Sequence, residues 1–297
     1  MNLKPDYSIG VVDYLGRFDT YFRPLIRQLA AIFPDKEIIC ILNGHHDVAA
    51  QMKYIREASV FLSSFKNIRY YSFDDPKSLA KCWNRIILMS KTDKNLILND
   101  DLSVDPYFRV DLEKVLTEES DFFAINNSWS HFLISDQVIS QVGWFDERFP
   151  GIGWEDGDYM LRMAEKNIKP VSLDCLGIKN FVAPPTNAGW TDIAAGSSKY
   201  SETNKIFFLK KWHFNQLENE PGKNYLISFF WNGDKLSGEM KAGMATPDFY
   251  PLALINRRGA RSLSYQPEFI WYYQLKNLLR REIKNAVRII LRISRRS

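Results

Sequence analysis

Two short acidic runs stand where chemistry could take place, and the first follows an apolar stretch directly. Residues 95–98 predict a buried strand that leads into Asn99, Asp100 and Asp101. Mg²⁺ and Mn²⁺ take oxygen ligands and commonly combine one or two carboxylates with phosphate oxygens. The triplet therefore indicates a metal and diphosphate site. A solvated turn is the alternative, because Asn and Asp also favour turns.

The second run is Gly-Ile-Gly-Trp-Glu-Asp-Gly-Asp at residues 151–158. Glu155 and Asp156 are expected to open a helix, since apolar residues continue behind them at helical spacing. Helix capping explains acids in a first turn, but it does not explain Trp154 or the glycines. An indole can stack on a sugar face, and a neighbouring carboxylate can take a proton from a sugar hydroxyl. The segment is a candidate catalytic site, whose base the helix N-terminus would keep ionised.

The first half of the chain alternates strand-like and helix-like segments. Predicted strands are 8–13, 37–42, 68–73, 95–98 and 122–125, and predicted helices are 21–32, 48–62, 78–90 and 111–116. This alternation predicts an α/β fold with a mostly parallel sheet and helices on both faces. Ligands of such sheets bind at the carboxyl ends of the strands, where the first acidic run lies. No GxGxxG or P-loop motif is present, so dinucleotide and P-loop functions lose their main support.

The pattern is less regular after residue 140. Residues 182–198 are rich in Pro, Gly, Ala, Thr and Ser and predict a long loop, a length more typical of a functional lid than of a simple connection. Residues 205–212 predict a helix, and the Asn-Gly-Asp at 232–234 predicts a hairpin within 225–240.

Composition excludes several classes of protein. Among 297 residues, 45% are hydrophobic and 25% charged, which is typical of a globular protein and not of a disordered, collagen-like or disulfide-rich chain. Three widely spaced cysteines predict buried thiols rather than disulfides or a zinc site. The N-terminus lacks a secretory apolar region, and no stretch approaches a membrane span. We therefore expect a cytoplasmic protein, peripheral on the inner face of the membrane.

The membrane prediction rests on the charge distribution behind a net charge of +4. Residues 256–297 hold eleven Lys/Arg and two acids, so the tail carries +9 and the rest of the chain −5. Residues 275–293 place apolar and basic residues on opposite helix faces after Trp271, Tyr272 and Tyr273, as in a helix bound at an anionic membrane surface. Packing on the protein or on a second copy, as a homodimer, is the alternative. Nucleic-acid binding is disfavoured, because the basic face lacks stacking aromatics.

The order of these segments resembles the GT-A glycosyltransferases, especially inverting family-2-like enzymes and galactosyltransferases. Residues 142–149 (VGWFDERF) look like the family's "GGFDERF", residues 153–156 match its "GWED", and Arg162 follows in the usual helical place. Lys211-Trp212-His213 resembles its "KWG". The likeness covers about residues 8–215, and residues 142–162 are its specific part. It implies a Rossmann-like mixed sheet that binds a nucleotide-diphosphate sugar.

The resemblance also implies roles for individual residues. Those implied to contact the donor are Asp13, Arg17, Asn43, Asn84, Asn99 and Asp100. The first acid of the family's Asp-x-Asp motif is the neutral Asn99 here, so Asp101 must supply the main carboxylate to Mn²⁺ or Mg²⁺. Asp100 is left to face either the ribose or the metal. His213 is the candidate to complete the metal shell, although a histidine beside Trp212 is more often structural; His45, His46 and His131 have weaker claims.

The implied reaction is sugar transfer with inversion, in which Asp156 deprotonates an acceptor hydroxyl and Glu155 orients the acceptor or the base. Trp154 and Trp190 would be sugar platforms, and residues 182–198 would close over the donor. A UDP-sugar is favoured only by its frequency in the family. The implied acceptor is a glycan or lipid-linked saccharide, in the synthesis of bacterial surface polysaccharide such as capsule, O-antigen or lipooligosaccharide.

Two other functions stay open from the sequence. A metal-dependent nucleotidyltransferase would use a similar sheet, but it would be expected to carry a richer Gly and Lys/Arg loop than Gly16-Arg17. A non-catalytic nucleotide-sugar-binding scaffold is disfavoured by the retention of Asp101 and Asp156. The predicted domains are a catalytic domain at 1–220, an extension with the hairpin at 221–262, and the basic amphipathic helix at 263–297.

Overall fold

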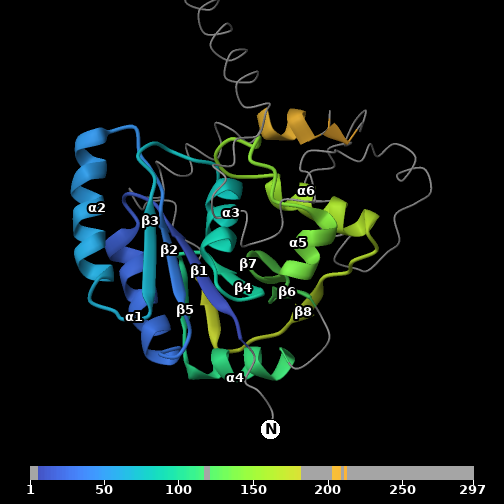
Figure 1. Ribbon diagram of the computed structural model, residues 1–297, viewed down its shortest axis with the longest axis horizontal. Coiled ribbons are helices and arrows are strands. Elements are labelled where there is room, and N and C mark those ends of the chain that lie inside the picture. The colour runs from blue at the N-terminus through green and yellow to red at the C-terminus, as the bar shows by residue number, and fades with distance from the viewer. Residues whose placement is uncertain (1–5, 117–120, 182–202, 209–210, 213–297) are drawn as a thin grey trace, which may run out of the picture. The chain divides into compact units, whose positions relative to one another are not determined.

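A seven-stranded sheet with helices on both faces forms the centre of the protein (Figure 1). The computed structural model describes residues 6–116, 121–181, 203–208, 211 and 212. The chain divides into two units, Met1–Arg261 and Ser262–Ser297, and the second lies wholly outside the described residues. Trp190, His213, the lid and hairpin segments, the predicted domain boundaries and the tail also lie outside them, so those predictions stay predictions.

The large sheet is mixed and has the strand order β3-β2-β1-β4-β7-β6-β8. Its strands are β1 (Ser8–Asp13), β2 (Ile38–Leu42), β3 (Ile68–Ser72), β4 (Lys94–Leu98), β6 (Phe122–Ile125), β7 (Ser128–Ser135) and β8 (Val171–Leu173). β1 pairs in parallel with β2 and β4, and β7 pairs antiparallel with β4 and β6. β5 (Leu102–Val104) and β9 (Ile178–Asn180) form a separate antiparallel pair. The predicted α/β class and mixed sheet are confirmed.

The strand order reverses at β1, because β2 lies on one side of it and β4 on the other. Open α/β sheets bind ligands in the crevice outside the carboxyl ends of the strands at such a switch point. Asp13 ends β1, and the Asn99–Asp101 triplet follows β4. The topology therefore brings the two polar strand ends together.

The helices with assigned bounds in the described residues differ in how they begin. They are η1, a π-helix (Phe18–Phe22), α1 (Arg23–Ile32), α2 (Val48–Leu62), α3 (Leu79–Met89), α4 (Pro106–Val115), α5 (Asp136–Val142) and α6 (Glu155–Glu165). Asp47, Ser78, Asp105 and Ser135 each accept a hydrogen bond from a backbone N–H in the first turn of α2, α3, α4 and α5. The predicted Ser78 cap is thus confirmed.

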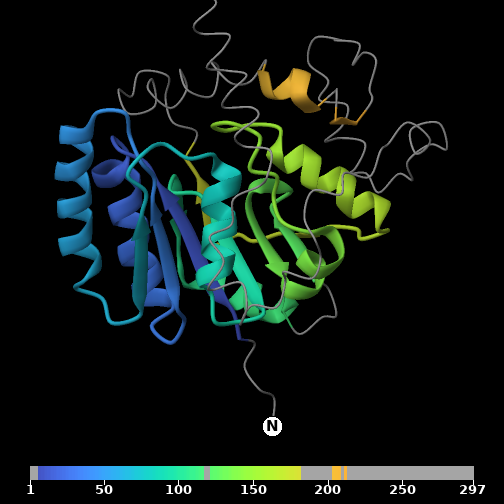
Figure 2. The same ribbon diagram turned by 45° about the horizontal axis from the view of Figure 1, so that its top comes forward.

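Apolar side chains cover both faces of the sheet. On one face α1, α2 and α4 pack residues such as Leu29, Ala58 and Phe108 against the strands; on the other, α3, α5 and α6 do so with residues such as Ile86 and Met163. The two views separate these layers (Figures 1 and 2). Gly10 of β1 permits the close approach of α3, because a Cβ there would lie 2.2 Å from Ile86 Cγ2.

Several predicted boundaries are wrong for local reasons. The helix predicted from Tyr21 begins at Arg23, because Phe18–Phe22 forms a π-helical turn first. The helix predicted from Asp111 begins at Pro106, behind the Asp105 cap. β7 and α5 were not predicted at all.

The prediction for the cysteines is confirmed within the described residues. Cys40, Cys82 and Cys175 are buried free thiols. No helix in the described part of the chain is long and apolar enough to cross a membrane.

Candidate active site

Arg17 lies buried at the switch point and pairs with both acids that follow β4. Its Nε and Nη2 donate to Asp100 Oδ2 and Oδ1 over 2.6 and 2.7 Å. Nη2 also lies 2.9 Å from Asp101 Oδ2. The planar guanidinium matches a carboxylate in this bidentate geometry. Arg17, Asp100 and Asp101 are 3%, 3% and 7% exposed, so the loop after β1 and the loop after β4 are joined by a buried ion cluster.

Burial disfavours the ionised forms of Asp13 and Asp100 at this edge. Burial raises the pKa of Asp100 to about 6, while the Arg17 guanidinium opposes that rise. Burial raises the pKa of Asp13 well above its usual range, and the charge of Asp100 adds to the rise. Asp13 Oδ2 accepts from the Tyr54 hydroxyl over 2.7 Å, whereas its buried Oδ1 has no hydrogen-bond partner among the described residues. Asp13 is thus a buried polar group at this edge, and the fold disfavours its ionised form.

Asn43 and Asn84 are engaged with the backbone of neighbouring loops. Asn43 Nδ2 donates to the Lys77 carbonyl over 3.0 Å, and its Oδ1 accepts from the Lys77 N–H over 2.9 Å. Asn84 makes the same two-sided contact with Phe145, over 2.9 and 3.0 Å. Both amides thus fix loops at the site, and the predicted contacts with the donor stay predictions.

Asp101 is the residue that best fits a divalent metal ion. Its Oδ1 is buried and has no hydrogen-bond partner in the part of the chain that the structure describes. The described residues contain no group of three or more His, Cys, Asp and Glu side chains able to hold a metal. A diphosphate-bound Mg²⁺ or Mn²⁺ needs only one or two protein carboxylates, because phosphate and water oxygens complete its shell. The donor set therefore fits a metal bound together with a nucleotide diphosphate.

His131 is a further polar residue at this edge. It lies on β7, next to the position paired with Ile97 near the end of β4. Burial lowers its pKa to about 4, and the charge of Asp101 partly opposes the shift, so the imidazole lies within electrostatic range of that carboxylate. As a metal ligand it had a weaker claim than His213 from the sequence, and the antiparallel strand that carries it was not predicted.

The second half of the site is the turn that leads into α6. Gly151, Gly153 and Trp154 have φ values of 64°, 110° and 73°, and Trp154 is the N-cap of the helix. A left-handed conformation at a residue as bulky as Trp is uncommon and costs on the order of 1–3 kcal/mol. The turn leaves Trp154 half-buried, with its ring centroid 5.1 Å from that of Phe208. One side of the indole is thus packed while part of it remains accessible.

The two carboxylates after Trp154 have different surroundings. Glu155 is 2% exposed, and its Oε2 lacks a hydrogen-bond partner among the described residues. Burial, reinforced by the charge of Asp156, raises the pKa of Glu155 to about 8. Asp156 is only half-buried, and its Oδ1 accepts from the Gly157 N–H over 2.8 Å. Asp156 is therefore the carboxylate of the pair that a ligand can reach.

The electrostatics of Asp156 differ from the sequence prediction. A helix N-terminus alone would lower its pKa, but burial raises it, and the N–H groups of Gly157 and Asp156 only partly compensate. A carboxylate with a raised pKa is a stronger base. The difference thus favours the role of a general base.

Tyr14 connects the two halves of the site. Burial is the largest cause that raises the pKa of its hydroxyl, and the charges of Asp100 and Glu155 both contribute. The Leu79 N–H at the start of α3 also donates to the Gly151 carbonyl over 2.8 Å. Asp100 and Glu155, from the two acidic runs, therefore both lie within electrostatic range of the Tyr14 hydroxyl.

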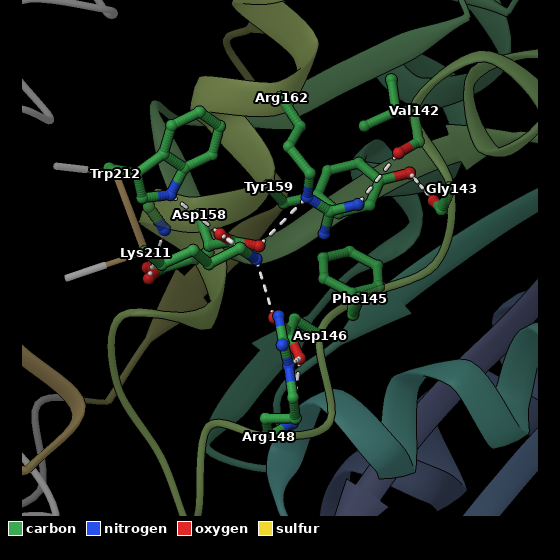
Figure 3. Close-up of polar contacts among 12 residues, drawn as sticks. Val142, Gly143, Phe145, Asp146, Arg148, Asp158, Tyr159, Arg162, Lys211 and Trp212 are labelled. Carbon is green, nitrogen blue, oxygen red and sulfur yellow. Dashed lines mark hydrogen bonds and ion pairs between the residues drawn. The ribbon is translucent and has the colours of Figure 1, made fainter. Parts of the chain in front are cut away.

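A buried ion network lies behind the turn (Figure 3). Asp158 Oδ1 accepts from Trp212 Nε1 over 2.9 Å, and its Oδ2 accepts from Arg162 Nε over 3.0 Å. Lys211 Nζ bridges Asp158 Oδ1 and Asp146 Oδ2 at 2.5 and 2.7 Å. The members of this network belong to the motifs that resemble the GT-A family, but no role was predicted for the network from the sequence.

Comparisons with known proteins agree with this architecture. No protein-family model and no curated protein matches the chain. Among solved structures, mannosyltransferase PcManGT from Pyrobaculum calidifontis, in complex with GDP-Man and Mn²⁺, aligns at a TM-score of 0.50 and 12% identity over 96% of this chain and 88% of that one.

Two further structures align less well. Glucosyl-3-phosphoglycerate synthase from Mycobacterium tuberculosis, with Mn²⁺, UDP and glucosyl-3-phosphoglycerate, gives a TM-score of 0.49 and 13% identity over 69% of this chain and 80% of that one. S. aureus TarS 1–349 gives 0.43 and 11% over 54% and 55%. The topology and the full-length alignment to the mannosyltransferase together show that the chain has the fold of the GT-A glycosyltransferases.

Proposed function

We propose that the protein is a metal-dependent, inverting glycosyltransferase that moves a sugar from a nucleotide-diphosphate sugar to a hydroxyl of a glycan or lipid-linked saccharide. One observation carries the proposal. Asp101 has a buried carboxylate oxygen without a hydrogen-bond partner among the described residues, and Asp156 has an accessible carboxylate; their chain neighbours Asp100 and Glu155 both act electrostatically on Tyr14. The Asp101 oxygen suits a metal–diphosphate donor, and the Asp156 carboxylate suits activation of an acceptor.

In the donor half, the chain's own residues bind and orient the nucleotide diphosphate. Asp13 ends β1 at this edge, and Arg17 holds Asp100 and Asp101 in place. A divalent ion at Asp101 would neutralise charge that develops on the leaving diphosphate. The bound mannosyltransferase complex, with GDP-Man and Mn²⁺, supports this type of donor.

In the acceptor half, Asp156 takes the proton from the acceptor hydroxyl. The acceptor oxygen forms a bond to the anomeric carbon as the bond from that carbon to the phosphate oxygen breaks, and the electron pair leaves with the nucleoside diphosphate. A single in-line displacement inverts the configuration. Trp154 offers a half-exposed indole as a sugar platform. Because the pKa of Glu155 is about 8, this side chain is protonated at neutral pH and can donate a hydrogen bond that orients the acceptor or the base.

The finer parts of the proposal come from the sequence. Trp190 as a second platform, His213 as a metal ligand, residues 182–198 as a lid and the basic tail as an inner-membrane anchor or dimer contact all lie outside the described residues. One described contact supports the proposed lid. The Phe181 N–H donates to the Asp101 carbonyl over 2.8 Å, so the residue before residues 182–198 lies beside the proposed metal ligand. The anchor would place a lipid-linked acceptor for surface polysaccharide within reach.

The experiment is a screen of nucleotide sugars for hydrolysis and for transfer to simple glycosides, with Mn²⁺ and with EDTA. We expect metal-dependent release of nucleoside diphosphate from one donor class. Release of pyrophosphate from a nucleoside triphosphate and a sugar phosphate would favour a nucleotidyltransferase. Binding of a nucleotide sugar without any turnover would favour a scaffold.

A further inference from the structure

The backbone just before Asp156 adopts a conformation that needs outside support. Gly151, Gly153 and Trp154 all have positive φ, and Trp154 makes no side-chain cap to the helix it opens. Such conformations persist where the surrounding structure determines them. The identity of the groups that hold this turn therefore bears on the position of the carboxylate at its end.

One face of the segment 203–212 packs on this turn. Asn204, Phe208 and Trp212 are each fully buried, and they are spaced four residues apart, as on one face of a helix. The described parts of this segment lie next to the turn and α6, in orange in Figures 1 and 2. We call Asn204, Phe208, Lys211 and Trp212 the brace.

Asn204 binds the backbone of the turn directly. Its Nδ2 donates to the carbonyls of Pro150 and Gly153 over 3.0 and 2.8 Å, and it lies 3.5 Å from the Ile152 carbonyl. A side-chain amide has two N–H donors, which these two shorter contacts use. The Asn204 amide thus binds both Pro150 and Gly153, and so links the two ends of the turn through one side chain.

The rest of the brace grips the start of α6. The Phe208 ring lies against Trp154, and its Cε2 would be 3.7 Å from a Cβ on Gly157. Trp212 Nε1 and Lys211 Nζ both bind Asp158 Oδ1 (Figure 3). The brace therefore contacts the chain on both sides of Asp156, at residues 150–154 and at 157–158.

We propose that the brace fixes the position of the general base and that Asn204 is a positioning residue for Asp156. It acts through the backbone of residues 150–154 and touches no substrate. The inference deepens the proposed function and rests on it for its catalytic consequence. Its structural consequence, a turn ordered by Asn204, stands independently.

Three variants test the proposal. Asn204→Ala removes both donors, and Asn204→Asp keeps the shape of the side chain but turns an oxygen toward the carbonyls. Ile206→Ala is the matched control, because Ile206 lies on the same segment and is 45% exposed. Each variant is measured by hydrogen–deuterium exchange over residues 150–158 and by kcat and donor KM in the transfer assay.

We expect both Asn204 variants to exchange faster at 150–158 while the strands keep their protection, and to lose at least tenfold in kcat with donor KM within twofold. Ile206→Ala should change neither. Unchanged exchange, unchanged kcat, or an equal loss in Ile206→Ala would overturn the proposal. If the wild type shows no transfer, the proposed function fails, and the exchange result alone decides whether Asn204 orders the turn.

Discussion

At the scale of single residues, the site depends on charges that the fold buries. Arg17 neutralises Asp100 and Asp101, which are both almost inaccessible. The causes that shift the pKa of the buried Glu155 carboxyl include no basic side chain. Breaking a buried pair leaves an uncompensated charge, whereas an exposed pair contributes little. The stability of the free protein should therefore report on the site before any ligand is known.

Arg17→Ala should destabilise the protein by about 3–5 kcal/mol, because it leaves Asp100 and Asp101 buried without their cation. Urea unfolding measures the change. Lys53→Ala is the control, since its pair with Glu57 is exposed and should contribute less than about 1 kcal/mol. Adding Asp100→Asn to Arg17→Ala should recover part of the loss; strictly additive effects would contradict the buried pair.

Glu155 should make the protein less stable as pH rises from about 7 to 8. Its folded pKa is about 8, above its ordinary value, so over this range the folded state retains a proton that the unfolded state has lost. Stability falls with pH wherever the folded state binds more protons. Thermal unfolding across pH 7–9 checks this, with Glu155→Gln as the comparison. The variant should lack the fall, and an identical fall in both proteins would show that Glu155 is not its source.

At the scale of elements, close packing between helices and strands fixes the positions of the two acidic runs relative to each other. Gly10 brings α3 onto β1, and Leu79 at the start of α3 reaches the Gly151 carbonyl. Gly10→Ala should therefore cost about 1–3 kcal/mol, because its Cβ would overlap Ile86.

Gly157→Ala is the matched control for that substitution. Its Cβ would meet Phe208 at an ordinary contact distance of 3.7 Å, and Gly157 lies within α6. Alanine in a helix is more favourable than glycine by roughly 0.5–1 kcal/mol, so this variant should be neutral or more stable. Unfolding measurements that rank the two variants in the opposite order would contradict the packing described here.

The elements also show how far sequence could predict the fold and the site. Short continuous apolar runs located β1, β2 and β4 closely, and a helical pattern located α2, because both are local signals. β7 did not show one, since its strand is defined by antiparallel pairing with β4 and β6.

At the site, motif order placed Asp101 and Asp156 in one region, but side-chain partners could not be predicted. Asn43 and Asn84 were assigned to the donor, and the structure shows their amides bound to the backbone of Lys77 and Phe145. Asn204 lies just before the helix predicted at 205–212, and only the tertiary structure shows that its amide binds the carbonyls of Pro150 and Gly153. Long-range hydrogen bonds are a property of the tertiary fold.

At the scale of the whole chain, charge separates an acidic body from a basic tail. Residues 256–297 carry +9 and the remainder −5. Removing residues 269–297 should abolish sedimentation with vesicles that contain anionic phosphatidylserine, while binding to neutral phosphatidylcholine vesicles stays weak for both forms. Equal sedimentation of both forms would count against the membrane role, and a changed oligomeric state would favour the helix-packing alternative.

The proposal that Asp156 is the general base of sugar transfer is tested most directly by comparing Asp156→Asn with the wild type. The assay uses Mn²⁺ and the nucleotide sugar that the donor screen identifies. Transfer rate and affinity for the nucleoside diphosphate are measured on the same preparations. We expect the transfer rate of Asp156→Asn to fall by about 10²–10⁴-fold, the usual contribution of a general base, while its nucleotide affinity stays within twofold of the wild-type value. Transfer at the wild-type rate in Asp156→Asn would contradict the proposal.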